Sequence, residues 1–201
     1  MAFLRDHFWC LDFAIGASIL LCVCALFAAK RLSPLTFRLF LAGLAIGLTW
    51  EIPLSTLDGL GIVHIFDFLT SPPAPFAVVL ASHTCWDGGL CLVGLGLVRA
   101  LCPAPHFVGF RWRELLVLLA WGQLQELGIE LLSSGSAGWT YVPAWWNPSL
   151  FQFQGKHITL VPQLMWLWGA AAFYAAARAL TLSLRDGPSP ADGQREQGPT
   201  G

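Results

Sequence analysis

The chain contains five apolar stretches that are each long enough to cross a lipid bilayer. They run over residues 8–29, 35–57, 74–101, 113–133 and 158–182. A spanning helix needs about 20 mainly apolar residues, because each residue advances about 1.5 Å through a hydrocarbon layer roughly 30 Å thick. In lipid, every backbone polar group must find its hydrogen-bond partner within the protein, which favours helices. We therefore expect an all-α, polytopic membrane bundle of five transmembrane helices.

Composition points to the same class of protein. Of the 201 residues, 56% are hydrophobic and 11% are charged, whereas about a quarter of the residues in a typical soluble domain are charged. The Lys and Arg residues are scattered between the apolar stretches and form no basic face, which argues against nucleic-acid binding. The first stretch is longer than the apolar core of a signal peptide, and Lys30 and Arg31 follow it, so we expect it to remain as a membrane helix.

The distribution of Lys and Arg predicts the orientation of the bundle. One side carries eight of them and the other side two; the first set is Lys30, Arg31, Arg38, Arg99, Arg111, Arg113, Arg185 and Arg195, and the second is Arg5 and Lys156. The positive-inside rule then places the N-terminus outside or in a lumen and the C-terminus in the cytoplasm. We expect one transmembrane domain over residues 1–184, and a disordered cytoplasmic tail over 185–201 because that segment is rich in Pro, Gly, Asp and Gln. The membrane is expected to be the endoplasmic reticulum in a eukaryote or the plasma membrane in a bacterium.

Four of the ionisable residues inside the predicted spans are the candidates for a reactive site. His83 and Asp87 are one helical turn apart in the third span, Glu51 lies in the second and Glu126 in the fourth. Burying such groups costs several kcal/mol unless they face a protein interior, a cavity or a partner. Counted at 1.5 Å per residue, all four lie roughly 9 to 20 Å from the same end of the bundle. We expect them to line one polar chamber as catalytic residues, because carboxyl and imidazole groups are the usual proton donors and acceptors.

Further polar and aromatic residues fall at the same level. Gln123 and Glu130 share the helix face of Glu126, and an indole face stabilises a developing cation. The candidate substrate-binding residues are Trp50, Trp86, Gln123, Glu130, Gln163, Trp166 and Trp168.

Simpler interpretations stay open for several residues. Glu51 or Glu126 can form an interhelical clamp with His83, and Asp12 is expected near the membrane interface without a special role. Trp139, Trp145 and Trp146 are typical of an interfacial belt, and the loop that contains them is either a cover for the chamber or an anchor. The six cysteines are expected to pack as small apolar residues. We predict no metal site and no cofactor.

The layout of the chain resembles the emopamil-binding protein family. The resemblance rests on five helices, Glu51 late in the second, Asp87-Gly88-Gly89-Leu90 in the third, Gly122-Gln123 leading into the acids of the fourth, and a fifth that bears tryptophan. The shared EXPERA domain includes sterol Δ8-Δ7 isomerases, their relatives and sigma-2 receptor proteins. The resemblance implies a sterol cavity in which one group protonates a ring double bond and another removes a proton. Glu51 and either His83 or Asp87 would then be donor and acceptor, with Trp166 or Trp168 over the cation.

A second resemblance implies related chemistry. Trp50-Glu51-Ile52 is similar to the Trp-Glu motif of fungal membrane-bound terpene cyclases of the paxilline type. Those enzymes use a glutamate and an aspartate to protonate an epoxide or alkene, and Asp87 would play the aspartate.

Together these features predict a membrane protein that handles a lipid or sterol-like small molecule. The first hypothesis is a sterol or isoprenoid isomerase that works by proton transfer through a carbocation, and the second is a terpene cyclase. The non-catalytic alternatives are a lipid-binding receptor, a small proton-coupled transporter and a polar layer that assembles with another subunit, including a second copy of the chain.

Overall fold

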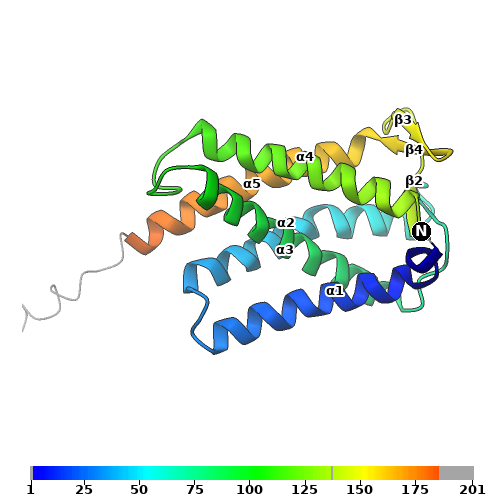
Figure 1. Cartoon of the computed structure of the whole chain (residues 1–201). Coiled ribbons are helices and arrows are strands. Elements are labelled where there is room, and N and C mark those ends of the chain that lie inside the picture. Colours follow the sequence, from blue (N-terminus) through cyan, green and yellow to red (C-terminus); the bar gives the residue numbers. More distant parts are fainter. Residues whose placement is uncertain (1, 137, 186–201) are drawn as a thin grey trace, which may run out of the picture.

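The computed structural model describes residues 2–136 and 138–185, and the predicted disordered tail lies outside these residues, apart from its first residue, Arg185. Five long helices form the bundle (Figure 1): α1 (Ala2–Ala28), α2 (Pro34–Gly59), α3 (Phe76–Leu101), α4 (Trp112–Ser134) and α5 (Leu160–Arg185). Each is long and apolar enough to cross a membrane. The helices begin and end within a few residues of the predicted stretches, except that α1 starts six residues earlier than expected.

The connections at one end of the bundle contain strands, which the all-α prediction did not include. They are β1 (Phe66–Phe68), β2 (Trp139–Tyr141), β3 (Ser149–Phe153) and β4 (Lys156–Thr159). β1 pairs antiparallel with β2, and β3 pairs antiparallel with β4. These segments are rich in aromatic and β-branched residues, which favour extended backbone. The β1–β2 pair joins the α2–α3 connection to the α4–α5 connection across this end of the bundle.

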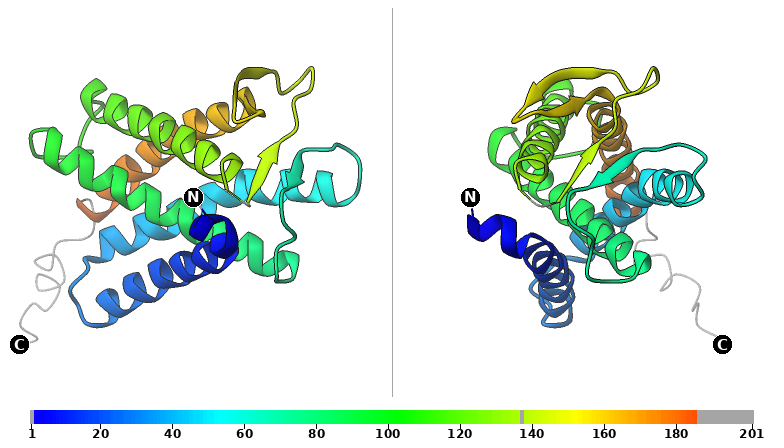
Figure 2. Two further views of the ribbon diagram at one scale, coloured as in Figure 1. Left: turned by 45° about the vertical axis from the view of Figure 1, so that its right-hand side comes forward. Right: turned by 90° about the vertical axis from the view of Figure 1, so that its right-hand side faces the viewer.

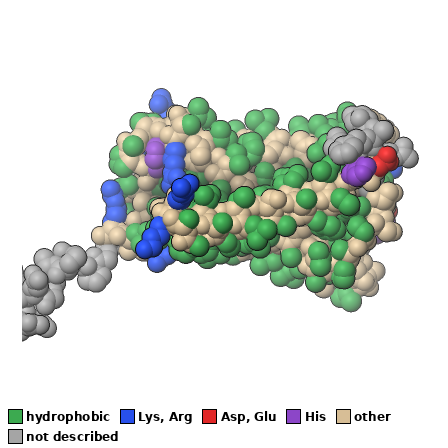
Figure 3. All heavy atoms as spheres, turned by 60° about the horizontal axis from the view of Figure 1, so that its bottom comes forward, with side chains coloured by type: hydrophobic (Ala, Val, Ile, Leu, Met, Phe, Trp, Pro, Cys, Tyr) green, Lys and Arg blue, Asp and Glu red, His purple; other side chains and the backbone are tan. Residues whose placement is uncertain are grey.

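The two ends of the bundle differ in charge. Lys and Arg gather at one end, as the visible face in Figure 3 shows, because the α1–α2 and α3–α4 connections and the last turn of α5 all lie there. We call this the basic end, and the end with the strands the strand end.

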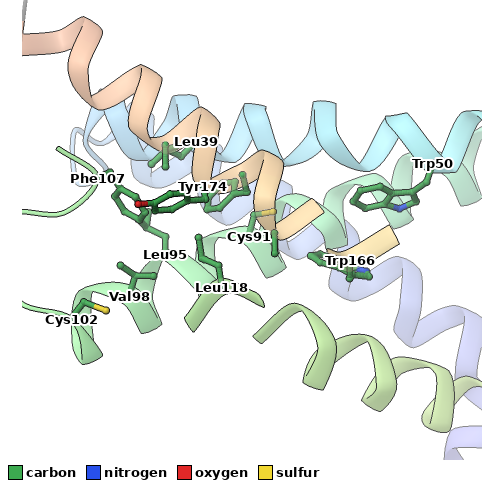
Figure 4. Packing of buried hydrophobic residues seen from close by; sticks show 13 residues of the cluster. Leu39, Trp50, Cys91, Leu95, Val98, Cys102, Phe107, Leu118, Trp166 and Tyr174 are labelled. Carbon is green, nitrogen blue, oxygen red and sulfur yellow. The ribbon is translucent and has the colours of Figure 1, made fainter. Parts of the chain in front are cut away.

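The main apolar cluster lies between α2, α3, α4 and α5 (Figure 4). It includes Leu39, Cys91, Leu95, Val98, Leu118, Phe173 and Tyr174, and it runs from the basic end to Trp50 and Trp166. Helix α1 lies outside this cluster and packs mainly on α3, so it forms one side of the bundle (Figures 1 and 2).

Local sequence explains where two of the helices begin. α2 starts with Ser33 as its N-cap, whose hydroxyl accepts a hydrogen bond from Thr36 N at 3.1 Å, and Pro34 follows at the first helical position. The first N–H groups of a helix have no partner within the helix, and at the start of α5 they find partners in other segments. In order, Thr159 N donates to Glu130 Oε1, Leu160 N to the Pro148 carbonyl and Val161 N to Asn147 Oδ1, while Pro162 has no N–H.

The α2–α3 contact depends on glycine at position 47. A methyl group at Gly47 would lie 2.8 Å from both Cβ and Cγ of Asp87, so only glycine lets the two helices approach here with Asp87 between them. At Gly96, on the same helix as Asp87, a methyl group would meet nothing within 4 Å.

We expect Gly47→Ala and Gly96→Ala to change stability in opposite directions. Gly47→Ala should lower the free energy of unfolding by about 1–3 kcal/mol, because overpacking forces Asp87 and α2 apart. Gly96→Ala should raise it by about 0.5–1 kcal/mol through helix propensity alone. Thermal unfolding of the two variants in the same detergent checks this. Equal stabilisation by both would show that Asp87 does not pack against Gly47.

Candidate functional site

The four predicted catalytic residues line one cavity in the half of the bundle nearer the strand end. Glu51, His83, Asp87 and Glu126 come from three helices and meet around a volume of about 190 Å³. Most of the other lining residues are apolar or aromatic, among them Leu11, Ile15, Leu90, Ile129 and Met165. The cavity therefore places proton-carrying groups around a space suited to an apolar molecule.

His83 lies between two carboxylates that belong to different helices. Its Nδ1 is 3.7 Å from Glu51 Oε2 and its Nε2 is 3.6 Å from Asp12 Oδ2. The ring of Trp139 covers the imidazole, with 4.9 Å between ring centroids. His83 is thus contacted from α1, α2 and β2 at once.

Asp12 differs from the expectation that it has no special role. Its residue is 9% exposed and lines the cavity. Ser82 Oγ donates to its Oδ2 at 3.4 Å, and Trp86 Nε1 donates to its backbone carbonyl at 3.2 Å. Its position near the start of a span concealed this role, because a carboxylate close to water carries no cost that would mark it.

Asp87 and Glu126 are the two most buried of the four predicted catalytic residues. Each is at most 6% exposed, and the carboxyl groups of Glu51 and Glu126 both act electrostatically on Asp87. Among the described residues, Asp87 Oδ2 has no hydrogen-bond partner. The indole of Trp166 lies beside Glu126. Two carboxyl groups buried this deeply without a basic partner among the described residues are best accommodated as neutral acids.

Glu130 lines the cavity, but its carboxylate is engaged by the protein itself. Oε1 accepts from Thr159 N at 2.8 Å and from Thr159 Oγ1 at 3.2 Å, and Oε2 accepts from Gln163 Nε2 at 3.4 Å. Gln123 Nε2 donates to the carbonyl of Gln163 at 2.9 Å. Gln123 and Gln163 do not line the cavity, so these three residues join α4 to the start of α5.

The tryptophans predicted to bind substrate separate into two groups. Trp50, Trp86 and Trp166 line the cavity, and the rings of Trp50 and Trp166 lie 5.6 Å apart between centroids. Trp168 is 57% exposed on the outer face of α5, where its indole donates to Thr49 Oγ1 at 3.3 Å. One helical turn holds 3.6 residues, so Trp166 and Trp168 point in different directions.

Strand β2 contributes two lining residues that the sequence analysis did not assign to the site. Trp139 and Tyr141 are two positions apart on an extended strand, so their side chains face the same side. Burial raises the pKa of the Tyr141 hydroxyl well above its usual value, and the nearby carboxyl group of Glu126 adds to this effect. The phenol therefore keeps its proton. The Trp-Thr-Tyr alternation is the signal for a two-faced strand, but it does not say what the strand covers.

A second cavity of about 160 Å³ adjoins the first toward the strand end. Both cavities are lined by Glu51, His83, Trp139, Tyr141 and Met165. The second one extends between α2 and α3 to Asp58, Phe66 and Phe76. The Glu51–His83 pair thus lies at the junction of two mostly apolar spaces.

The tryptophans of the predicted interfacial belt also differ in where they lie. Trp145 is 94% exposed, whereas Trp139 is half-buried over His83. The β1–β2 pair, which holds Trp139, covers the junction of the cavities. No group of three or more His, Cys, Asp or Glu residues within 2–136 and 138–185 has an arrangement that could hold a metal ion.

Comparisons with protein-family models, with curated proteins and with solved structures give no match to this chain.

Proposed function

We propose that the protein is an integral membrane enzyme that isomerises a sterol-like or isoprenoid lipid by proton transfer. The observation that supports this proposal is the meeting of Glu51, His83, Asp87 and Glu126 around a cavity whose other walls are largely apolar and aromatic. A structural clamp needs one acid and one base, whereas this group contains two further carboxyl groups in contact with the cavity.

The proposed reaction needs one proton donor and one acceptor. Asp87 or Glu126, as a neutral acid, adds a proton to one carbon of a double bond, and the electron pair of that bond forms the new C–H bond. The cation on the other carbon is stabilised by the faces of Trp50 and Trp166, which lie next to the acids. A proton then leaves the adjacent carbon for the Glu51–His83 pair, and its bonding electrons form the shifted double bond. Nothing is added to or removed from the substrate overall.

The surface of the bundle suggests how such a substrate enters. Ile15 on α1 and Leu132 on α4 line the first cavity and are also exposed, at 40% and 51%. An apolar molecule would pass between α1 and α4 directly from the bilayer. If the basic end faces the cytoplasm, as the positive-inside rule predicts, this opening lies in the outer or lumenal leaflet.

Two measurements test the proposal. Lipid mass spectrometry of protein purified in native-lipid discs should find a sterol or isoprenoid bound. Incubation of that lipid class with the protein in D₂O should shift a double bond and place one deuterium in the product, because the added proton comes from exchangeable acids. A bound lipid with neither change would identify a receptor, proton-coupled uptake into vesicles would identify a transporter, and a new ring would identify a cyclase.

The two tryptophan positions give a matched prediction for the cation. Trp50→Leu should slow turnover about 30-fold, because a desolvated cation–π contact is worth about 2 kcal/mol. Trp168→Leu removes an equal side chain from the outer face of α5 and should leave turnover within about twofold. Initial rates on the same substrate, with thermal unfolding to check folding, make the comparison. Equal losses at both positions would contradict an aromatic role inside the cavity.

A further inference from the structure

Helix α1 brings a second carboxylate to His83 and does so through a close, specific contact with α3. A methyl group at Gly16 would lie 2.5 Å from Ser82 Oγ, so glycine is needed for the two helices to approach at this level. One turn earlier, Ser82 Oγ and Trp86 Nε1 both donate to Asp12. Trp86 donates to the backbone carbonyl of Asp12 and so fixes this turn of α1 against α3. Ser82 Oγ also reaches Asp12 Oδ2 at 3.4 Å, on the Nε2 side of His83.

The two nitrogens of His83 therefore face two different carboxylates. Nδ1 faces Glu51 at 3.7 Å and Nε2 faces Asp12 at 3.6 Å. Neither distance is short enough for a hydrogen bond, but catalytic contacts of this kind are often long without substrate and tighten in the complex. A neutral imidazole has a proton on one nitrogen only and can donate to just one of the two, whereas an imidazolium donates to both.

We infer that Asp12 is a positioning residue that, together with Glu51, holds His83 as a doubly protonated imidazolium in a carboxylate–imidazole–carboxylate relay. The inference rests on the proposed function for its catalytic meaning. When the Glu51 carboxylate takes up the proton of the substrate it becomes neutral, and His83 Nε2 then gives its proton to Asp12, which leaves a neutral ring that keeps its proton on Nδ1. Asp12 does not need to touch the substrate in this scheme. Because α1 is also one wall of the entry path, the relay is complete only when α1 is seated on α3.

The charge state of His83 can be measured without any substrate. Protein labelled with [¹⁵N]histidine in lipid nanodiscs at pH 7 should show two protonated ring nitrogens for His83, assigned by their loss in His83→Gln. Asp12→Asn keeps the shape of the side chain but removes its charge, so the pair of imidazolium signals should be replaced by those of a neutral ring with one unprotonated nitrogen. Asp12→Glu restores the carboxylate and should restore the imidazolium.

A surface acid provides the matched control. Asp67 is 3.0 Å from His64 on the exposed face of the strand end, so Asp67→Asn should change the signals of His64 and leave those of His83 as they are. A neutral His83 in the unmodified protein, or an unchanged imidazolium in Asp12→Asn, would overturn the inference. This measurement does not depend on turnover. A protein that fails to isomerise any lipid would therefore disprove the proposed function without deciding the charge state of His83.

Discussion

Glu51→Gln should reduce the double-bond shift and the deuterium incorporation by about 10²- to 10⁴-fold, the usual contribution of a general acid or base. Glu51 lies at the junction of the two cavities and next to His83, so its carboxylate is the group best placed to take a proton from a substrate that spans both spaces. Glutamine has nearly the same volume and cannot take up that proton. Lipid binding and the melting temperature should therefore stay close to those of the unmodified protein.

The control for this experiment is again a surface acid. Asp67 has a side chain that is 61% exposed and lies outside the first cavity, so Asp67→Asn should leave turnover unchanged. Full turnover in Glu51→Gln would exclude Glu51 from the chemistry. Loss of lipid binding with no measurable turnover in either protein would favour the receptor.

The second large effect is on stability. We expect substitutions of two glutamates one turn apart on α4 to change the free energy of unfolding in opposite directions. Glu126→Gln should raise the free energy of unfolding by about 0.5–2 kcal/mol, because a buried functional acid is a liability for stability and the amide has no ionised form to desolvate. Glu130→Gln should lower it by about 1–3 kcal/mol, because an amide accepts through one oxygen only and turns its NH₂ group toward donors that the carboxylate had satisfied.

Thermal unfolding of the two variants in one detergent measures the contrast. Asp87→Asn should behave like Glu126→Gln, since Asp87 Oδ2 lacks a hydrogen-bond partner among the described residues. Lower melting temperatures for Asp87→Asn and Glu126→Gln would mean that these acids clamp the helices together. That result would remove the main support for a proton-transfer site.

The free-energy cost of placing an ionisable group against lipid explains which parts of the site could be predicted from sequence. Glu51, His83, Asp87 and Glu126 lie in long apolar stretches, where an ionisable group that faced lipid would cost several kcal/mol. Their side chains therefore have to face protein or a cavity, and the near-constant rise of a helix gives their depth. No such cost marks Asp12 near a helix end, or Trp139 and Tyr141 in a connection, so these lining residues were not predicted.

Helical phase alone did not show which neighbour each side chain meets. Glu126 and Glu130 share one face of α4, yet Glu130 is held by Thr159 and Gln163 while Glu126 lies beside Trp166. Trp166 and Trp168 are at similar depth, yet only Trp166 lines the cavity. The rotation of α5 against its neighbours decides this, and that rotation depends on packing partners that lie far away in the sequence.

The sequence by itself therefore determined the number of long apolar helices, their approximate ends and the acids expected to face away from lipid, because length and the cost of burying charge act within a single helix. Only the tertiary structure decided that α1 brings Asp12 to His83 and that β1 pairs with β2 across the strand end. It also decided that the Glu130 carboxylate, on α4, accepts hydrogen bonds from the start of α5. Each of these depends on contacts between segments separated by 25 or more residues, for which a pattern within one segment carries no information.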